Sequence, residues 1–84
     1  MTVTGTYAYV PNPCTTTPCL PGMVYAVKAK DTLYFLTIHG NFVTQNRYRL
    51  QPDDKMTVEG QTRRRTDIYG QPYHTIEVAR NQLI

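Results

Sequence analysis

Residues 23–38 read MVYAVKAKDTLYFLTI and contain two runs rich in β-branched and aromatic side chains, Met23–Ala29 and Thr32–Ile38. Such residues favour the pleated, half-buried surface of a β-sheet. Only Lys30 and Asp31 separate the two runs, which is the spacing of a tight hairpin. We therefore expect two antiparallel strands here, and a β domain around them.

The length of the turn decides which side chains of this hairpin share a face. A two-residue turn pairs Lys28 with Leu33 and Ala26 with Phe35, and it places Phe35 outward beside Lys28. A three-residue turn would slip one strand by one position and exchange the faces, so that Tyr34 would join Lys28 instead. We favour the two-residue turn, with Phe35 outward.

Three further runs alternate with a period of two and are predicted as strands: Thr2–Val10, Lys55–Thr62 and Tyr73–Ala79. Within the second of these, Gly60 stands where a strand could bend or bulge. The 84 residues are too few for two hydrophobic cores. The sequence thus predicts a single all-β domain over residues 1–84.

The connections between these strands differ in character. Residues 11–22 hold four prolines and are predicted to form an irregular loop. Residues 41–54 fit neither helical nor strand spacing, and we expect a short helix or an irregular crossover there. Residues 61–72 are predicted to form a polar loop that contains the three arginines of the segment.

Three segments together form a pattern of strand spacing. They are TVTGTY at 2–7, KMTVEG at 55–60 and YHTIEV at 73–78, with Asp67 and Gly70 in the polar loop between the last two. This pattern resembles small bacterial OB-fold (oligonucleotide/oligosaccharide-binding) domains. The resemblance implies a five-stranded Greek-key barrel, although an SH3-like barrel or a small sandwich remains an alternative.

The resemblance also implies where a ligand would lie. In OB-type barrels the ligand crosses strands two and three, flanked by the loop between strands one and two and the loop between strands four and five. Those loops correspond here to 11–22 and 61–72. We expect the fold to bring them to one end of the molecule.

Cys14 and Cys19 lie five residues apart in the proline-rich loop. A disulfide between them is our first interpretation, and it implies a periplasmic or secreted protein exported from a bacterial cytoplasm. Two free thiols in a cytoplasmic protein are the second. A metal or redox site comes last, because His39 and His74 are the only imidazoles and they lack zinc-like spacing.

Composition argues against catalysis and against a membrane span. The chain has no serine, and it has no phosphate-binding loop, zinc motif or glycine-rich cofactor fingerprint. We therefore expect no enzyme activity, no catalytic residue, no metal site and no cofactor. No window reaches the ~18 apolar residues of a transmembrane segment.

The formal net charge is +3, and the first charged side chain after the N-terminus is Lys28. This is less basic than most nucleic-acid-binding domains. We therefore expect a non-catalytic binding domain for a peptide, a glycan or a partner protein. Single-stranded nucleic acid is the alternative ligand, because aromatic and basic side chains lie together. The candidate binding residues are Lys28, Tyr34, Phe35, Arg63, Arg64, Arg65 and Tyr69.

Overall fold

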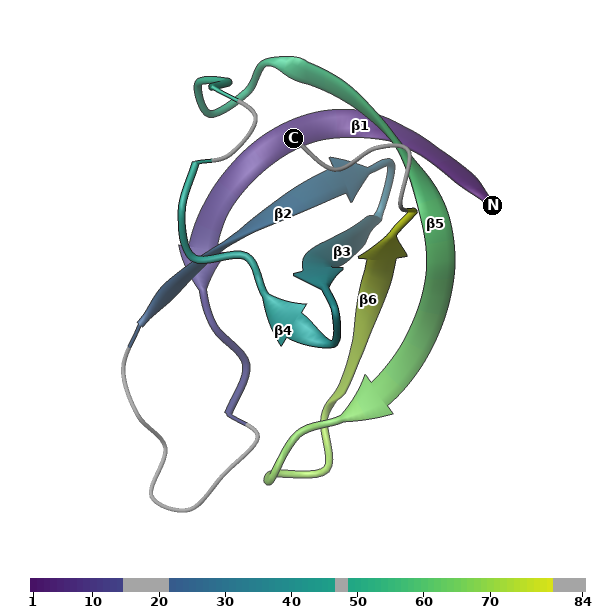
Figure 1. The fold of residues 1–84 in the computed structure, drawn as a ribbon. Helices are drawn as coiled ribbons and strands as arrows, with labels where there is room; N and C mark the ends of the chain where they lie inside the picture. Colours follow the sequence, from purple (N-terminus) through teal and green to yellow (C-terminus); the bar gives the residue numbers. More distant parts are fainter. Residues whose placement is uncertain (15–21, 47–48, 80–84) are drawn as a thin grey trace.

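The structure, a computed structural model, describes residues 1–14, 22–46 and 49–79. These residues form six strands of a single sheet and no helix (Figure 1). The all-β prediction is therefore confirmed. The strands are β1 Thr2–Pro11, β2 Met23–Ala29, β3 Thr32–Ile38, β4 Asn41–Phe42, β5 Lys55–Thr66 and β6 Pro72–Val78.

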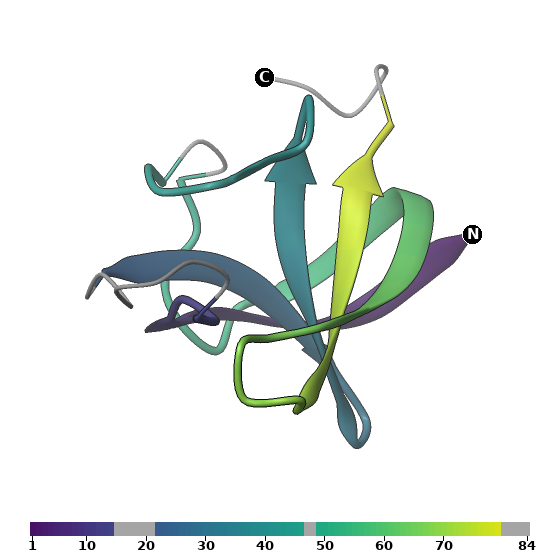
Figure 2. The same cartoon turned by 90° about the horizontal axis from the view of Figure 1, so that it is seen from below.

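The strand pairings link segments that are far apart in the sequence. The order across the sheet is β2-β1-β5-β6-β3-β4, and β2 additionally pairs with β3. All pairings are antiparallel except β3 with β6, where Tyr34–Thr37 run parallel to His74–Glu77. The sheet is strongly curled, so that β3 and β6 stand across the broad curve formed by β1 and β5 (Figure 2).

The central hairpin has the predicted register. Lys28 lies opposite Leu33 and Ala26 lies opposite Phe35, as a two-residue turn at Lys30 requires. The alternation of side chains then separates two hydrophobic clusters. The inner cluster consists of Val3, Tyr7, Val27, Leu36, Val43, Met56, Val58, Ile76 and Val78. The outer cluster consists of Val24, Ala26 and Phe35, with Val10, Leu33, Phe42 and Tyr73 packed against it.

The exposure predicted for Phe35 is wrong, although its face is right. Phe35 points away from the inner cluster, yet only 8% of it is exposed. The rings of Phe42 and Tyr73 meet it edge-on, with centroids 6.0 and 5.9 Å away. Edge-to-face contact is a favoured aromatic geometry, and here it covers the ring that we expected to face solvent.

The predicted end of the fourth long strand is also wrong. β5 does not stop at Thr62 but continues to Thr66, so Arg63–Arg65 lie on a strand and not in a loop. The reason is pairing with β6, which holds Gly60–Thr66 in an antiparallel ladder against Pro72–Val78. The loop between the two strands shrinks to residues 67–71.

For residues 41–54 the sequence left two possibilities, a short helix or an irregular crossover, and the described residues form the irregular crossover. The described residues of this stretch contain the two-residue strand β4 and no helix. Backbone hydrogen bonds hold the path in place: Tyr25 N donates to Val43 O, and Tyr7 N donates to Asp54 O.

Glycine is required where two strands bend closely over their neighbours. A Cβ on Gly60 would overlap the backbone carbonyl oxygen of Glu77, and a Cβ on Gly5 would overlap that of Lys28. The glycine at position 60 therefore has a steric reason, and β5 runs through it without interruption. The described part of the chain contains no helix that is long and apolar enough to cross a membrane.

Candidate binding site

The alternation of β5 sorts its arginines onto two faces. Arg63 and Arg65 share the outward face, and they lie directly opposite Thr75 and Tyr73 of β6. Arg64 has the opposite parity, that of the buried Met56 and Val58 earlier in the strand. Because residues i and i+2 of a strand point the same way, two of the three cations are presented together.

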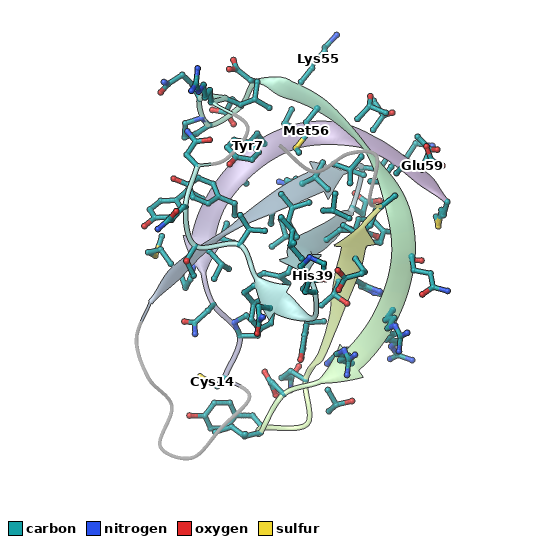
Figure 3. The ribbon with its side chains drawn as sticks, viewed as in Figure 1. Tyr7, Cys14, His39, Lys55, Met56 and Glu59 are labelled. Atoms are coloured by element: carbon teal, nitrogen blue, oxygen red, sulfur yellow. The ribbon has the colours of Figure 1, made fainter. Side chains whose placement is uncertain are left out.

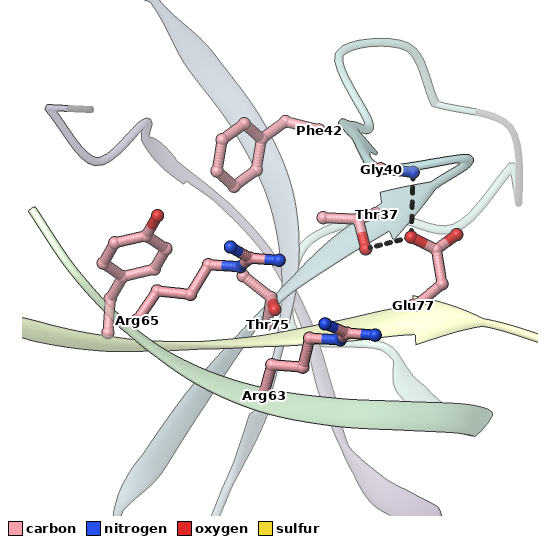
Figure 4. Close-up of a pocket in the computed structure, with 8 residues that line it drawn as sticks. Thr37, Gly40, Phe42, Arg63, Arg65, Thr75 and Glu77 are labelled. Carbon is pink, nitrogen blue, oxygen red and sulfur yellow. Dashed lines mark hydrogen bonds between the residues drawn. The ribbon is translucent and has the colours of Figure 1, made fainter. Parts of the chain in front are cut away.

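Arg63 and Arg65 line one side of a pocket of about 390 Å³. Both side chains extend from β5 over β6, Arg65 toward Phe42 and Arg63 toward the side of Glu77 (Figure 4). We call this the arginine pocket. Its lining residues are Thr37, Gly40, Phe42, Arg63, Arg65, Tyr73, Thr75 and Glu77.

Among the described residues that line the arginine pocket Glu77 is the one carboxylate, and hydrogen bonds within the protein hold it. Its Oε1 accepts from the Thr37 hydroxyl at 3.0 Å and from the Gly40 backbone N–H at 2.9 Å. Its Oε2 accepts from the His39 backbone N–H at 2.7 Å. Glu77 thus fixes the turn after β3, while both arginine side chains are exposed to solvent. The arrangement favours an anionic group of a ligand.

A second pocket of about 370 Å³ lies on the other side of Tyr73, and we call it the proline pocket. Asp31 and Asp67 contribute carboxylates to it. Asp67 Oδ1 accepts hydrogen bonds from the backbone N–H groups of Tyr69 and Gln71, which shapes the loop between β5 and β6. The lining residues are Pro13, Asp31, Thr32, Leu33, Phe35, Asp67, Pro72, Tyr73 and His74.

The two predicted loops do meet in their described parts. The backbone N–H of Ile68 donates to the carbonyl of Cys14 at 2.9 Å. Figure 3 shows Cys14 at the end of the molecule where the loop after β5 turns. Cys19 lies outside the described residues, so the Cys14–Cys19 disulfide stays a prediction.

The structure brings only some of the predicted site residues together. Arg63 and Arg65 share the arginine pocket, and Phe35 contributes to the proline pocket. Lys28 is exposed and lies on the same face, across β3 from Tyr73, but it lines neither pocket. Tyr69 is 69% exposed at the tip of the loop.

Tyr34 and Arg64 lie apart from the pockets. Tyr34 packs against the inner cluster, and its ring centroid is 5.8 Å from that of His74. Arg64 pairs with the same histidine across β5 and β6. Both therefore have the parity of the core, and neither reaches the outward face.

Six of the residues that line the arginine pocket were not predicted: Thr37, Gly40, Phe42, Tyr73, Thr75 and Glu77. Tyr73 and Thr75 alternate with Ile76 and Val78 of the inner cluster along β6, so the period of two already placed them on the outward face, where Thr75 is nevertheless buried. Phe42 follows a turn in a stretch with no readable period. Its place over Phe35 had no signal in the sequence.

The part of the chain described by the structure holds no group of three or more His, Cys, Asp or Glu side chains that could bind a metal ion. Comparison with protein-family models, curated proteins and solved structures finds no match to this chain. The candidate site therefore rests on its geometry alone.

Proposed function

We propose that this chain is a non-catalytic binding domain of the OB type whose arginine pocket binds a carboxylate-bearing ligand, such as an acidic peptide or an acidic glycan. The observation that carries the proposal is that Arg63 and Arg65 lie side by side on one face of β5. Arg65 lies opposite Tyr73, whose aromatic ring lines the same pocket. Two guanidinium groups provide bidentate donors for carboxylates, and aromatic rings provide apolar contact beside them.

Two features of the sheet support the OB architecture. The pairings run from β1 through β2, β3, β6 and β5 back to β1. A parallel pairing of the third and the last long strand lets five strands complete such a circuit. β4 adds to the edge of β3 outside it.

The charges along the outward face favour a short anionic group over a long polyanion. The arginine pocket carries Arg63 and Arg65, but the neighbouring proline pocket carries Asp31 and Asp67. A nucleic-acid strand crossing both pockets would place phosphates beside carboxylates. In addition, Phe35, one of the rings that the nucleic-acid alternative expects to be open for stacking, is buried.

The test is a titration of the isotope-labelled protein followed by NMR, at low salt. The probes are a galacturonate trisaccharide and a capped tri-glutamate peptide, both too short to pair as a strand. We expect shifts at Tyr73 and Thr75 that weaken with salt. Arg63→Ala with Arg65→Ala removes them, whereas Lys55→Ala, an exposed cation on the same strand, preserves them.

The outcomes separate the candidate ligands. If neither acidic probe shifts the arginine pocket, or if the Lys55→Ala variant loses binding as much as the arginine variants do, the proposal fails. Tighter binding of an oligothymidylate, with shifts along the same face, would favour the nucleic-acid alternative instead.

Export from a bacterial cytoplasm to the periplasm or the medium is part of the same proposal. It rests on the Cys14 and Cys19 pair in the proline-rich loop. Thiol titration of the protein from its native source tests it. We expect no reactive thiol, and two free thiols would point to the cytoplasm.

A further inference from the structure

The second half of β5 has a paired strand along only one of its two edges, among the described residues. Lys55–Glu59 pair with β1, whereas Gly60–Thr66 pair with β6. Figure 1 shows β6 on one side of this half and no described strand on the other. The segment Gln61–Thr66, which we call the arginine edge, is therefore a strand edge within the described chain.

The backbone direction of the arginine edge follows from the residues beside it. Gly60 exchanges hydrogen bonds with Met1 on the β1 side: its N–H donates to Met1 O, and its carbonyl accepts from Met1 N. Glu59 points the other way, since its carbonyl accepts from Ala79 N on the side of β6. Backbone groups alternate along an antiparallel strand. Those of Thr62, Arg64 and Thr66 thus point away from β6.

The side chains of this edge are strongly basic. Arg63, Arg64 and Arg65 are consecutive and all exposed. Charged side chains on an edge discourage indiscriminate strand pairing. Antiparallel pairing of two copies about Arg64 would place Arg64 opposite its own symmetry mate, which is unfavourable. The edge therefore selects against a second copy and in favour of an acidic strand.

We propose that the arginine edge binds an extended acidic segment of a partner protein as an added strand. The backbone groups of Thr62, Arg64 and Thr66 supply the hydrogen-bond ladder, and the arginines supply charge complementarity. This surface differs from the arginine pocket, because the pocket lies on the sheet face and the ladder forms at the strand edge. Either can exist without the other.

The test uses a capped peptide of about ten residues that alternates Thr and Glu. Its binding is followed by NMR-detected amide hydrogen exchange. We expect slower exchange at Thr62, Arg64 and Thr66, with no change at Arg63 and Arg65, whose amides already face β6. A peptide of the same length that alternates Thr and Lys should give no protection.

Thr62→Pro separates strand addition from simple charge attraction. Proline is tolerated where a backbone N–H faces away from the sheet, but it removes the donor that the added strand needs. We expect it to weaken peptide binding about tenfold, which corresponds to one lost hydrogen bond in a ladder. Thr62→Ala, the matched control, retains binding within about twofold.

Several outcomes would overturn the proposal. These are unprotected edge amides, equal binding by the proline variant, or concentration-dependent self-association of the protein through this edge. Slow exchange at Arg63 and Arg65 confirms that the proline variant is folded. If it is not, Arg64→Glu replaces it: retained binding of the acidic peptide by that variant would equally reject the proposal. Binding of the galacturonate trisaccharide reports on the arginine pocket alone.

Discussion

The two halves of β5 form one continuous strand, yet they differ in burial and in the strand that each pairs with. In Lys55–Glu59 exposed residues alternate with the buried Met56 and Val58, and the partner strand is β1. In Gln61–Thr66 no residue is buried, and the partner strand is β6. Gly60 is the junction. The first half contributes buried side chains to the core, and the second half carries exposed arginines.

The largest expected effect is at the junction itself. Gly60→Ala places a Cβ against the backbone of Glu77, where no flexible side chain can yield. We expect a loss of about 3 kcal/mol in the free energy of unfolding, as for overpacked sites. Urea denaturation measures it. In Gly22→Ala the new Cβ meets Asn12 at an ordinary 3.6 Å, so that variant serves as the control. Equal stability of both variants would contradict the steric role of Gly60.

Val58→Ala tests the first half of β5. Val58 is 1% exposed in the inner cluster, and truncation removes two methyl groups and leaves a cavity. We expect a loss of about 2 kcal/mol in the free energy of unfolding. The exposed neighbour in Glu59→Gln should change it by less than about 0.5 kcal/mol. Similar free energies of unfolding for Val58→Ala and Glu59→Gln would show that the first half of β5 does not contribute to the core.

Glu77→Ala tests the carboxylate that faces the second half. The substitution removes the acceptor of the Thr37, His39 and Gly40 hydrogen bonds. We expect a loss of about 1.5 kcal/mol, because charged acceptors contribute more than neutral ones but this one is partly exposed. Glu59→Ala, an exposed carboxylate on β5, is the control for urea denaturation. An unchanged stability would show that the turn after β3 does not depend on Glu77.

The smallest expected effect on stability is in the second half of β5. Arg63→Ala combined with Arg65→Ala removes two exposed side chains, so we expect unfolding to change by less than about 0.5 kcal/mol. Circular dichroism during urea denaturation measures this. A loss as large as that of Val58→Ala would mean that the arginines belong to the stabilising half after all.

The sequence predicted the hairpin β2–β3 closely. The structure agrees with the predicted first and last residues of both strands, with the turn at Lys30–Asp31 and with the pairing of Lys28 with Leu33. Apolar and β-branched residues crowd this stretch, and the two residues between the runs favour a two-residue turn over the three-residue alternative. The separation of Tyr34 from Phe35 follows from the same period of two.

The sequence predicted the candidate site only in part. Arg63–Thr66 looked like a loop because none of its side chains is apolar. What makes this segment a strand is its ladder with β6, and a ladder of backbone groups leaves no trace in side-chain pattern. Phe35 was expected outward in solvent for a similar reason: its cover, Phe42, comes from a stretch without periodicity. Contacts between residues far apart in the sequence therefore determine both the length of β5 and the burial of Phe35.

The parallel contact of β3 with β6 has a consequence for folding. It joins Tyr34–Thr37 to His74–Glu77, which lie some 40 residues later in the chain. Contacts of such sequence separation are slow to form because a long loop must first be closed. Thr37 and Glu77, which share a hydrogen bond, belong to the two segments that this event unites. On the ribosome, the arginine pocket therefore forms only after the chain has been made as far as Glu77.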